Sequence, residues 1–288
     1  LAKQGFVEVL APIIGPCTDP GIRGARQATI DYFGRRYKVM SSAILYKQMT
    51  VASLGKVYFF SPNIRLEPLE TVKTGRHLCE FFQVDVEEAG ASYFDSMSTA
   101  ERLLRDVCMR TLERHEKDLA SLGRELTVSG APYKRMTHRE AVDLLRSKGY
   151  ESEYSQELSW GAEEAISGMF DSPFFVYDYP KGSRGFYDRV DSEHPGILRD
   201  FDMIYPEGFG EAASGAERET DYEVVTRKMR SNGEDPESYE WYMEMLKSGV
   251  PQTAGFGIGV ERLTRYICGL RSIWAARPFP KVAGICSP

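Results

Sequence analysis

The chain has 288 residues, of which 42% are hydrophobic and 27% charged, a composition typical of a globular protein with a sizeable core. Its net charge of −6 excludes a broad, non-specific nucleic-acid surface, so any RNA contact would be local. The five cysteines are scattered and lack CxxC spacing, which argues against a disulfide framework or a zinc site and favours a cytoplasmic location. No stretch approaches the ~20 apolar residues of a membrane span, and the first residues are too charged for a signal peptide.

The N-terminal part of the chain predicts strands around a loop, followed by a helix. Residues 6–14 alternate like a strand, residues 15–31 are rich in Gly, Arg and Pro and predict a mobile loop, and residues 32–40 return to a strand. A helix is expected after them, with Ser42 as its cap and Gly55 at its end. Its Lys47 lies among apolar neighbours, where a surface lysine that extends its ammonium to water is more common than a ligand contact.

Residues 58–87 predict a strand, a charged loop and a second strand, and we expect the rest of the chain to be built around them. Arg65 and Glu67 leave the first strand two residues apart, so both side chains point to the same face. A loop with Lys73, Arg76 and His77 follows. The second strand alternates between an apolar face and a face that carries Phe81, Gln83, Asp85 and Glu87. Cations at one end and carboxylates at the other suit a zwitterion beside a polyphosphate, although a hairpin with solvated charges has the same pattern.

The rest of the chain predicts helices between short strands. Apolar spacing predicts an amphipathic helix over 97–122, and a capping box at 137–140 opens another helix that ends near Gly149. A polar helical stretch over 150–170 belongs to an expected insertion at about 123–170. The remaining expected elements are a strand at 172–180, a strand pair over 201–219, helices over 220–233 and 235–249, and a glycine-rich strand from 253 that leads into a last helix.

A few side chains point to phosphate chemistry. GFGIG at 255–259 precedes a helix as a phosphate-binding loop does, but the signal is weak, and close packing of a strand on neighbouring backbone is the interpretation that we favour. Arg262 and Arg65 together would supply two guanidiniums for phosphate. Asp202 and Glu211 would face inward and hold Mg²⁺ through oxygen ligands. Because the sequence has no His/Cys cluster and no nucleophilic-serine motif, nucleotidyl transfer is the favoured chemistry.

Several segments resemble those of a known family. Arg65-Leu66-Glu67 with RHLCEFFQVDVE, and then GFGIGVERL, resemble motifs two and three of the class II aminoacyl-tRNA synthetases, and FVEVLAPI resembles motif one. The segments SSAILYKQ, FYDR and GEAASGAERE are similar to the aspartyl/asparaginyl branch. The resemblance covers essentially the whole chain. It implies an α+β fold with an antiparallel sheet flanked by helices, a single catalytic domain over 1–288, and a homodimer.

The resemblance also implies a role for each matched residue. Arg65 and Arg262 would be the catalytic residues, with Arg65 on the α-phosphate. The ATP-binding set would be Arg65, Glu67, Arg76, His77, Phe81, Gly259 and Arg262. The amino-acid set would be Ser42, Lys47, Gln83, Asp85 and Arg218, with Gln83 and Asp85 on the ammonium and Lys47 and Arg218 on a carboxylate. Mg²⁺ would be held by Asp202 and Glu211.

The leading functional hypothesis depends on Lys47 and on the expected absence of a second domain. The resemblance associates this lysine with aspartate, and two cations favour a carboxylate over a neutral amide. We expect no anticodon-reading OB-fold of ~100 residues before Leu1, and on this expectation the chain is most similar to the archaeal asparagine synthetase related to asparaginyl-tRNA synthetase. We therefore expect ATP, aspartate and ammonia to give asparagine, AMP and pyrophosphate through an aspartyl-adenylate. We do not expect tRNA as a partner, although the sequence does not exclude it.

Two alternatives stay open. The chain can be the catalytic portion of an aspartyl- or asparaginyl-tRNA synthetase, which an OB-fold encoded upstream of Leu1 would favour. It can also be a paralogue that binds nucleotide or a protein partner without catalysis, against which the intact Arg65, Glu67 and Arg262 argue.

Overall fold

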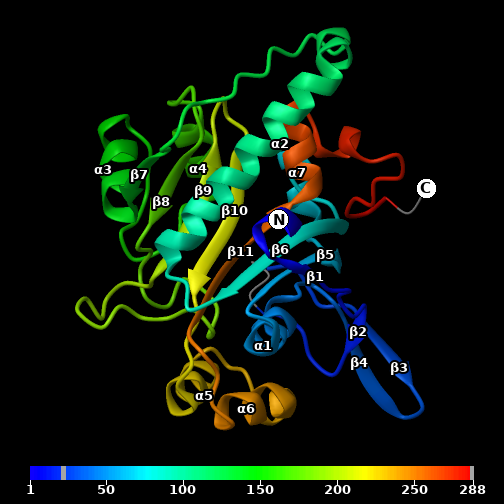
Figure 1. Cartoon of the computed structure of the whole chain (residues 1–288), viewed down its shortest axis with the longest axis vertical. Coiled ribbons are helices and arrows are strands. Elements are labelled where there is room, and N and C mark those ends of the chain that lie inside the picture. The colour runs from blue at the N-terminus through cyan, green and yellow to red at the C-terminus, as the bar shows by residue number, and fades with distance from the viewer. Residues whose placement is uncertain (21–23, 286–288) are drawn as a thin grey trace.

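The computed structural model describes residues 1–20 and 24–285, and it is built on one large sheet (Figure 1). The strand order is β1-β5-β6-β11-β10-β9-β8-β7, with the six central strands antiparallel and both edge strands parallel to their neighbours. The strands are β1 (Val7–Glu8), β5 (Lys56–Ile64), β6 (Glu80–Ala89), β7 (Lys134–Thr137), β8 (Phe174–Tyr177), β9 (Asp200–Tyr205), β10 (Gly210–Glu217) and β11 (Thr253–Gly259). A three-stranded sheet is formed by β2 (Ile14–Gly15), β4 (Arg35–Val39) and β3 (Thr29–Tyr32).

Helices flank the sheet, which confirms the predicted α+β class. The α-helices are α1 (Ile44–Leu54), α2 (Tyr93–Ser121), α3 (His138–Ser147), α4 (Trp160–Ser167), α5 (Tyr222–Ser231), α6 (Glu240–Lys247) and α7 (Val260–Cys268). Short 3₁₀ turns are η1 (Ala2–Gln4), η2 (Leu69–Thr74), η3 (Pro236–Tyr239) and η4 (Ile273–Ala276). No helix in the described part of the chain combines the length and apolar character that a membrane span requires.

One face of the sheet is apolar throughout, whereas the other is apolar over β8 and β9 and polar over β6, β11 and β10. Helix α2 runs across the apolar face (Figure 1), where its Met97 and Leu104 pack with Val86 of β6 and Phe256 of β11 in the main core. Because successive strand residues point to opposite faces, the residues between them, such as Asp85, point away from α2. Helix α1 lies on this second face beside α5 and α6, with its own buried cluster. The polar face is therefore where a cavity can form.

The glycines of β11 give the polar face its space. Gly255 and Gly257 alternate with the core residues Phe256 and Ile258. A Cβ on Gly255 would lie 2.7 Å from the Cδ of Glu87 on the neighbouring strand. GFGIG is thus a closely packed strand, as favoured from the sequence, and its glycines leave room for buried carboxylates.

Most predicted elements are present, with corrections at their ends. The strand expected over 6–14 is only the short β1 and β2, and residues 15–31 include β3, with residues 21–23 lying outside the described residues. Ala43, not Ser42, is the N-cap of α1, although the Ser42 hydroxyl accepts a 3.2 Å hydrogen bond from the Ile44 N–H. Between 150 and 170 only α4 is an α-helix. The helix expected to begin at 220 is α5, and its N-cap is Asp221, whose side chain accepts from the Val224 N–H.

Gly255→Ala is expected to destabilise the protein by about 2 kcal/mol or more, because the new methyl group has to displace Glu87. Chemical denaturation monitored by circular dichroism measures this loss. Gly161→Ala in α4 is the control, since a Cβ there meets nothing within 4 Å and alanine favours a helix. Equal stability of wild type and Gly255→Ala would show that the close approach has no cost.

Candidate functional site

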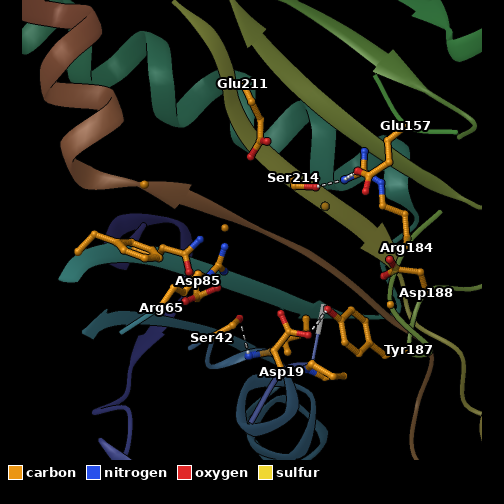
Figure 2. Close-up of a pocket in the computed structure, with 18 of the residues that line it drawn as sticks. Asp19, Ser42, Arg65, Asp85, Glu157, Arg184, Tyr187, Asp188, Glu211 and Ser214 are labelled. Carbon is orange, nitrogen blue, oxygen red and sulfur yellow. Dashed lines mark hydrogen bonds and ion pairs between the residues drawn. The ribbon is translucent and has the colours of Figure 1, made fainter. Parts of the chain in front are cut away.

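A cavity of about 430 Å³ opens on the polar face of the sheet, between β6, β10, β11, α1 and the loop that follows β8. Figure 2 shows Arg65, Asp85 and Ser42 on one side of it and Glu211, Ser214 and Arg184 on the other. Thirteen of the predicted site residues line this cavity: Ser42, Lys47, Arg65, Glu67, Arg76, His77, Phe81, Gln83, Asp85, Glu211, Arg218, Gly259 and Arg262. The structure therefore brings together residues spread over 220 positions of the sequence; only Asp202 is not on the wall.

One end of the cavity carries aromatic and cationic groups. The Arg65 guanidinium lies 5.2 Å from the centre of the Phe81 ring, and its Nε donates to the Ser41 carbonyl at 3.2 Å. Arg262 pairs with Glu211 at 3.0 Å. Burial raises the pKa of Glu67, while Arg65 and Arg262 oppose the rise. A flat ring beside two guanidiniums is suited to a nucleotide base and its phosphates.

The loop between β5 and β6 places Arg76 and His77 near the same end. Arg76 is 4% exposed and pairs with Glu163 of α4 at 2.8 Å. The His77 ring lies 4.5 Å from that of Trp160, also on α4. The segment expected as an insertion thus supplies part of the cavity wall.

The other end of the cavity contains two buried cations among three carboxyl groups. Lys47 Nζ lies 3.4 Å from Asp85 and 3.5 Å from Glu87. Arg218 binds Glu87 through Nε at 3.0 Å and Asp188 through Nη1 at 3.0 Å. Burial acts to raise the pKa of Glu87, but Arg218 and Lys47 outweigh it and hold the pKa below its usual range.

These pairs correct the interpretation of Lys47 and Arg218 as a doubly cationic site for a carboxylate. Lys47 is 2% exposed, and it also donates to the carbonyls of Val86 and Phe256 at 3.4 and 3.1 Å. The Coulomb attraction of both cations is already directed at carboxylates of the protein. The charge argument for aspartate assumed cations without protein partners, and the structure does not show that arrangement.

The residues expected to bind the ammonium line the cavity but have protein partners. Asp85 accepts a 2.7 Å hydrogen bond from Ser61 in addition to its contact with Lys47. The side-chain oxygen of Gln83 accepts from Asn63 at 3.0 Å. A Cβ on Gly257 would meet Asp85 at 3.1 Å and Gln83 at 3.2 Å, so both polar groups flank this glycine at the cavity surface.

Of the two predicted Mg²⁺ ligands, Glu211 lines the cavity and Asp202 does not. Asp202 is fully buried; one oxygen pairs with Arg184 at 2.6 Å and the other accepts from Ser214 at 2.7 Å. An arginine thus provides the positive charge for which Mg²⁺ was expected. Glu211 does line the cavity, and as a hard oxygen donor it fits a Mg²⁺ ion shared with a ligand's phosphates. Among the described residues no cluster of three or more His, Cys, Asp or Glu side chains forms a metal site.

The sequence did not identify several residues on the cavity wall. Asp19, Asp188, Arg184 and Ser214 line it (Figure 2). Asp188 lies in the FYDR segment, which was a signal for it. Ser214 lies in the GEAASGAERE segment, but strand alternation did not place it on the wall, because it comes three residues after Glu211 and would normally point to the opposite face. The β9–β10 register shifts between Glu211 and Ala213, which marks a β-bulge with one extra residue in β10. Because of this extra residue, the side chains of Glu211 and Ser214 both face the cavity.

A family model described as tRNA synthetases class II (D, K and N) matches residues 1–283. The chain belongs to this class II synthetase family. It is 36% identical over 284 residues to a protein of Pyrococcus furiosus named asparagine–tRNA ligase, covering 98% of this chain and 64% of that protein. The chain therefore spans less than two thirds of this relative's length.

Solved class II synthetases have the same fold. Asparaginyl-tRNA synthetase of Pyrococcus horikoshii complexed with asparaginyl-adenylate superposes with a TM-score of 0.94 and 34% identity, over all of this chain and 66% of that one. The enzyme from Entamoeba histolytica, also in complex with asparaginyl-adenylate, gives a TM-score of 0.89 and 26% identity, over all of this chain and 64% of that one.

These comparisons overturn the leading functional hypothesis. The relatives are named asparagine–tRNA ligases, so ammonia-dependent asparagine synthesis and an ammonia substrate are not supported. The same names contradict the expectation that tRNA is not a partner in this family. The first alternative, the catalytic portion of an aspartyl- or asparaginyl-tRNA synthetase, fits the class II synthetase relatives better.

Asp200, on the cavity wall, makes a pH-dependent contribution to stability. Burial raises the pKa of its carboxyl to about 8, with Asp188 adding to the rise and Arg184 opposing it. Between the ordinary value of 3.8 and about 8 the folded protein holds a proton that the unfolded chain has lost. The contribution is therefore full below about pH 3.8, declines as the pH rises from 3.8 to about 8, and is absent above that.

An asparagine side chain resembles a protonated carboxyl group. Asp200→Asn is therefore expected to remove part of the pH dependence of the free energy of unfolding. Between pH 6 and pH 9 the wild type should lose about 2 kcal/mol of unfolding free energy relative to the variant. Urea denaturation across this range measures the difference. Asp171→Asn, at an exposed carboxylate, is the control and should show no such trend; parallel curves for wild type and Asp200→Asn would contradict the assignment.

Proposed function

We propose that this chain carries the catalytic core of an asparaginyl-tRNA synthetase, which activates L-asparagine with ATP and passes it to tRNA. The observation that carries the proposal is the charge balance at the amino-acid end, where Lys47 and Arg218 are outnumbered by Asp85, Glu87 and Asp188. The similarity to two synthetases in complex with asparaginyl-adenylate supports it.

A side-chain amide complements this end better than a carboxylate does. Arg218 has five N–H donors, and hydrogen bonds to Glu87, Asp188 and Gly255 engage four of them. One donor remains for the amide oxygen, and the carboxyl of Asp188 can accept from the amide nitrogen. A second carboxylate would add negative charge beside Asp188 and leave its own lone pairs unmatched.

The opposite end would hold ATP in the orientation that the reaction needs. Phe81 would stack on adenine, Glu67 would approach its amino group, and Arg262 would reach the outer phosphates. Arg65 would lie on the α-phosphate. Glu211 would hold Mg²⁺, which supplies further charge neutralisation at the phosphates when bound.

The chemistry would then be positioning and charge neutralisation. The α-carboxylate of asparagine attacks the α-phosphorus, a new O–P bond forms, and the bond to the β-phosphate oxygen breaks to release pyrophosphate. Arg65 would stabilise the negative charge that develops on the α-phosphate oxygens, because a guanidinium donates two parallel hydrogen bonds. Gln83 at the cavity wall would orient the α-ammonium. Transfer to tRNA, as in the named relatives, would complete the reaction.

ATP–pyrophosphate exchange tests the substrate. With Mg²⁺ present, exchange should depend on asparagine, with kcat/KM at least about tenfold above that for aspartate. Asp188→Asn should reduce this ratio by about tenfold, because it removes the carboxyl that repels aspartate. Glu193→Gln, at an exposed position of the same loop, is the control. Exchange that depends on aspartate alone would refute the proposal.

Arg65→Ala tests the chemical step. We expect asparagine-dependent exchange to fall at least ~100-fold, since the charge on the α-phosphate loses its main partner. Arg36→Ala removes an exposed arginine that pairs with Asp31, far from the cavity lining, and should leave the rate unchanged. Undiminished exchange in Arg65→Ala, with normal circular dichroism in both variants, would show that the arginine has another role.

A further inference from the structure

Helix α4 makes a buried ion pair with a residue of the cavity wall, and the proposed reaction does not explain this pair. Glu163 is 1% exposed and lies 2.8 Å from Nη2 of Arg76, which is 4% exposed. The backbone carbonyl of Trp160, one turn earlier on α4, accepts from Nη1 of the same arginine at 3.1 Å. Both terminal nitrogens of Arg76 are thus held by one helix from a distant part of the sequence.

The surroundings leave this guanidinium little freedom. A Cβ on Gly210 would lie 2.7 Å from the Cζ of Arg76, so the start of β10 packs directly against the guanidinium. The ring of Trp160 contacts His77, whose Nδ1 lies 2.8 Å from the hydroxyl of Thr74 in the same loop. Contacts from α4 and β10 therefore fix both Arg76 and the loop that carries it.

Electrostatics explain why a buried carboxylate is needed here. Burial lowers the pKa of Arg265, and the charges of Arg76 and Arg262 lower it further, which indicates that three guanidiniums share this end of the cavity. Their mutual repulsion would drive Arg76 outward in the absence of ligand. Glu163 offsets the repulsion and the cost of removing Arg76 from water. A guanidinium has five N–H donors, so donors remain for a ligand in the cavity that Arg76 lines.

We propose that Glu163 is a positioning residue that holds Arg76 for the outer phosphates of the nucleotide, so that α4 is part of the nucleotide site. The inference rests on the proposed function in one respect, the binding of ATP in this cavity. The ligand group that Arg76 would contact is a polyphosphate. Binding of a nucleotide with β- and γ-phosphates should therefore depend on Glu163, whereas binding of a nucleoside monophosphate should not.

Glu163→Gln tests this, because it removes the charge and keeps the shape. Isothermal titration calorimetry should show the Kd of ATP rising about tenfold, while the Kd of AMP changes less than about twofold. Glu164→Gln, the same change at the next residue, which is exposed, is the matched control and should alter neither constant. Equal weakening of ATP and AMP would mean general damage to the site, and unchanged ATP binding would mean no positioning role; either result overturns the inference.

Two further variants complete the test. In a double-mutant cycle, Arg76→Met should abolish the effect of Glu163→Gln on ATP binding, because both act through one guanidinium; additive losses would overturn the inference. If Glu163→Gln does not fold, Glu163→Asp keeps the charge but draws it back, and a selective loss of about threefold for ATP is expected. The ATP titrations contain no asparagine, so failure of asparagine-dependent exchange would refute the proposed function without affecting this result.

Discussion

The site depends on one buried carboxylate, Glu87, and on the constraint that a charge removed from water needs partners. Glu87 has no exposed surface, and Arg218, Lys47 and Thr253 surround it within 3.5 Å. Removing either cation would leave negative charge in the interior without its full compensation, at a cost of several kcal/mol. The network therefore holds together helix α1, strand β6, the end of β10 and strand β11, which come from four separate parts of the sequence.

The pairing of these cations with protein carboxylates limits which amino acid the cavity can bind. Cations that neutralise buried carboxylates cannot also attract a charged ligand with their full strength. The amino-acid end is consequently a polar, rigid surface, and it is better matched to a neutral amide. The nucleotide end has the opposite charge balance. Three carboxyl groups lie there as well, but they face four guanidiniums, those of Arg65, Arg76, Arg262 and Arg265, which leaves positive charge for a polyphosphate. One cavity thus separates a charge-neutralised subsite from a cationic one.

The sequence predicted the residues of the site much better than their interactions. Alternation in β6 placed Gln83 and Asp85 on the cavity face, because a period of two is a property of every strand. The electrostatic partners could not be predicted, since Arg218 and Glu87 are 131 positions apart and meet only through the pairing of β6, β11 and β10. The same limit explains why Asp202 was expected to bind Mg²⁺: nothing near it in the sequence indicated that Arg184, on a separate loop, would occupy its oxygen. The bulge that aims Ser214 at the cavity likewise has no signal in the local pattern.

The central claim is that pre-paired cations make this site select a neutral amide, and a pair of inert adenylate analogues tests it most directly. Asparaginyl- and aspartyl-sulfamoyl adenosine differ only in the side-chain amide, so the nucleotide contacts cancel in a comparison of their dissociation constants by calorimetry. The account predicts that the asparaginyl compound binds at least about tenfold more tightly, a difference of ~1.4 kcal/mol. Equal affinities, or tighter binding of the aspartyl compound, would contradict it.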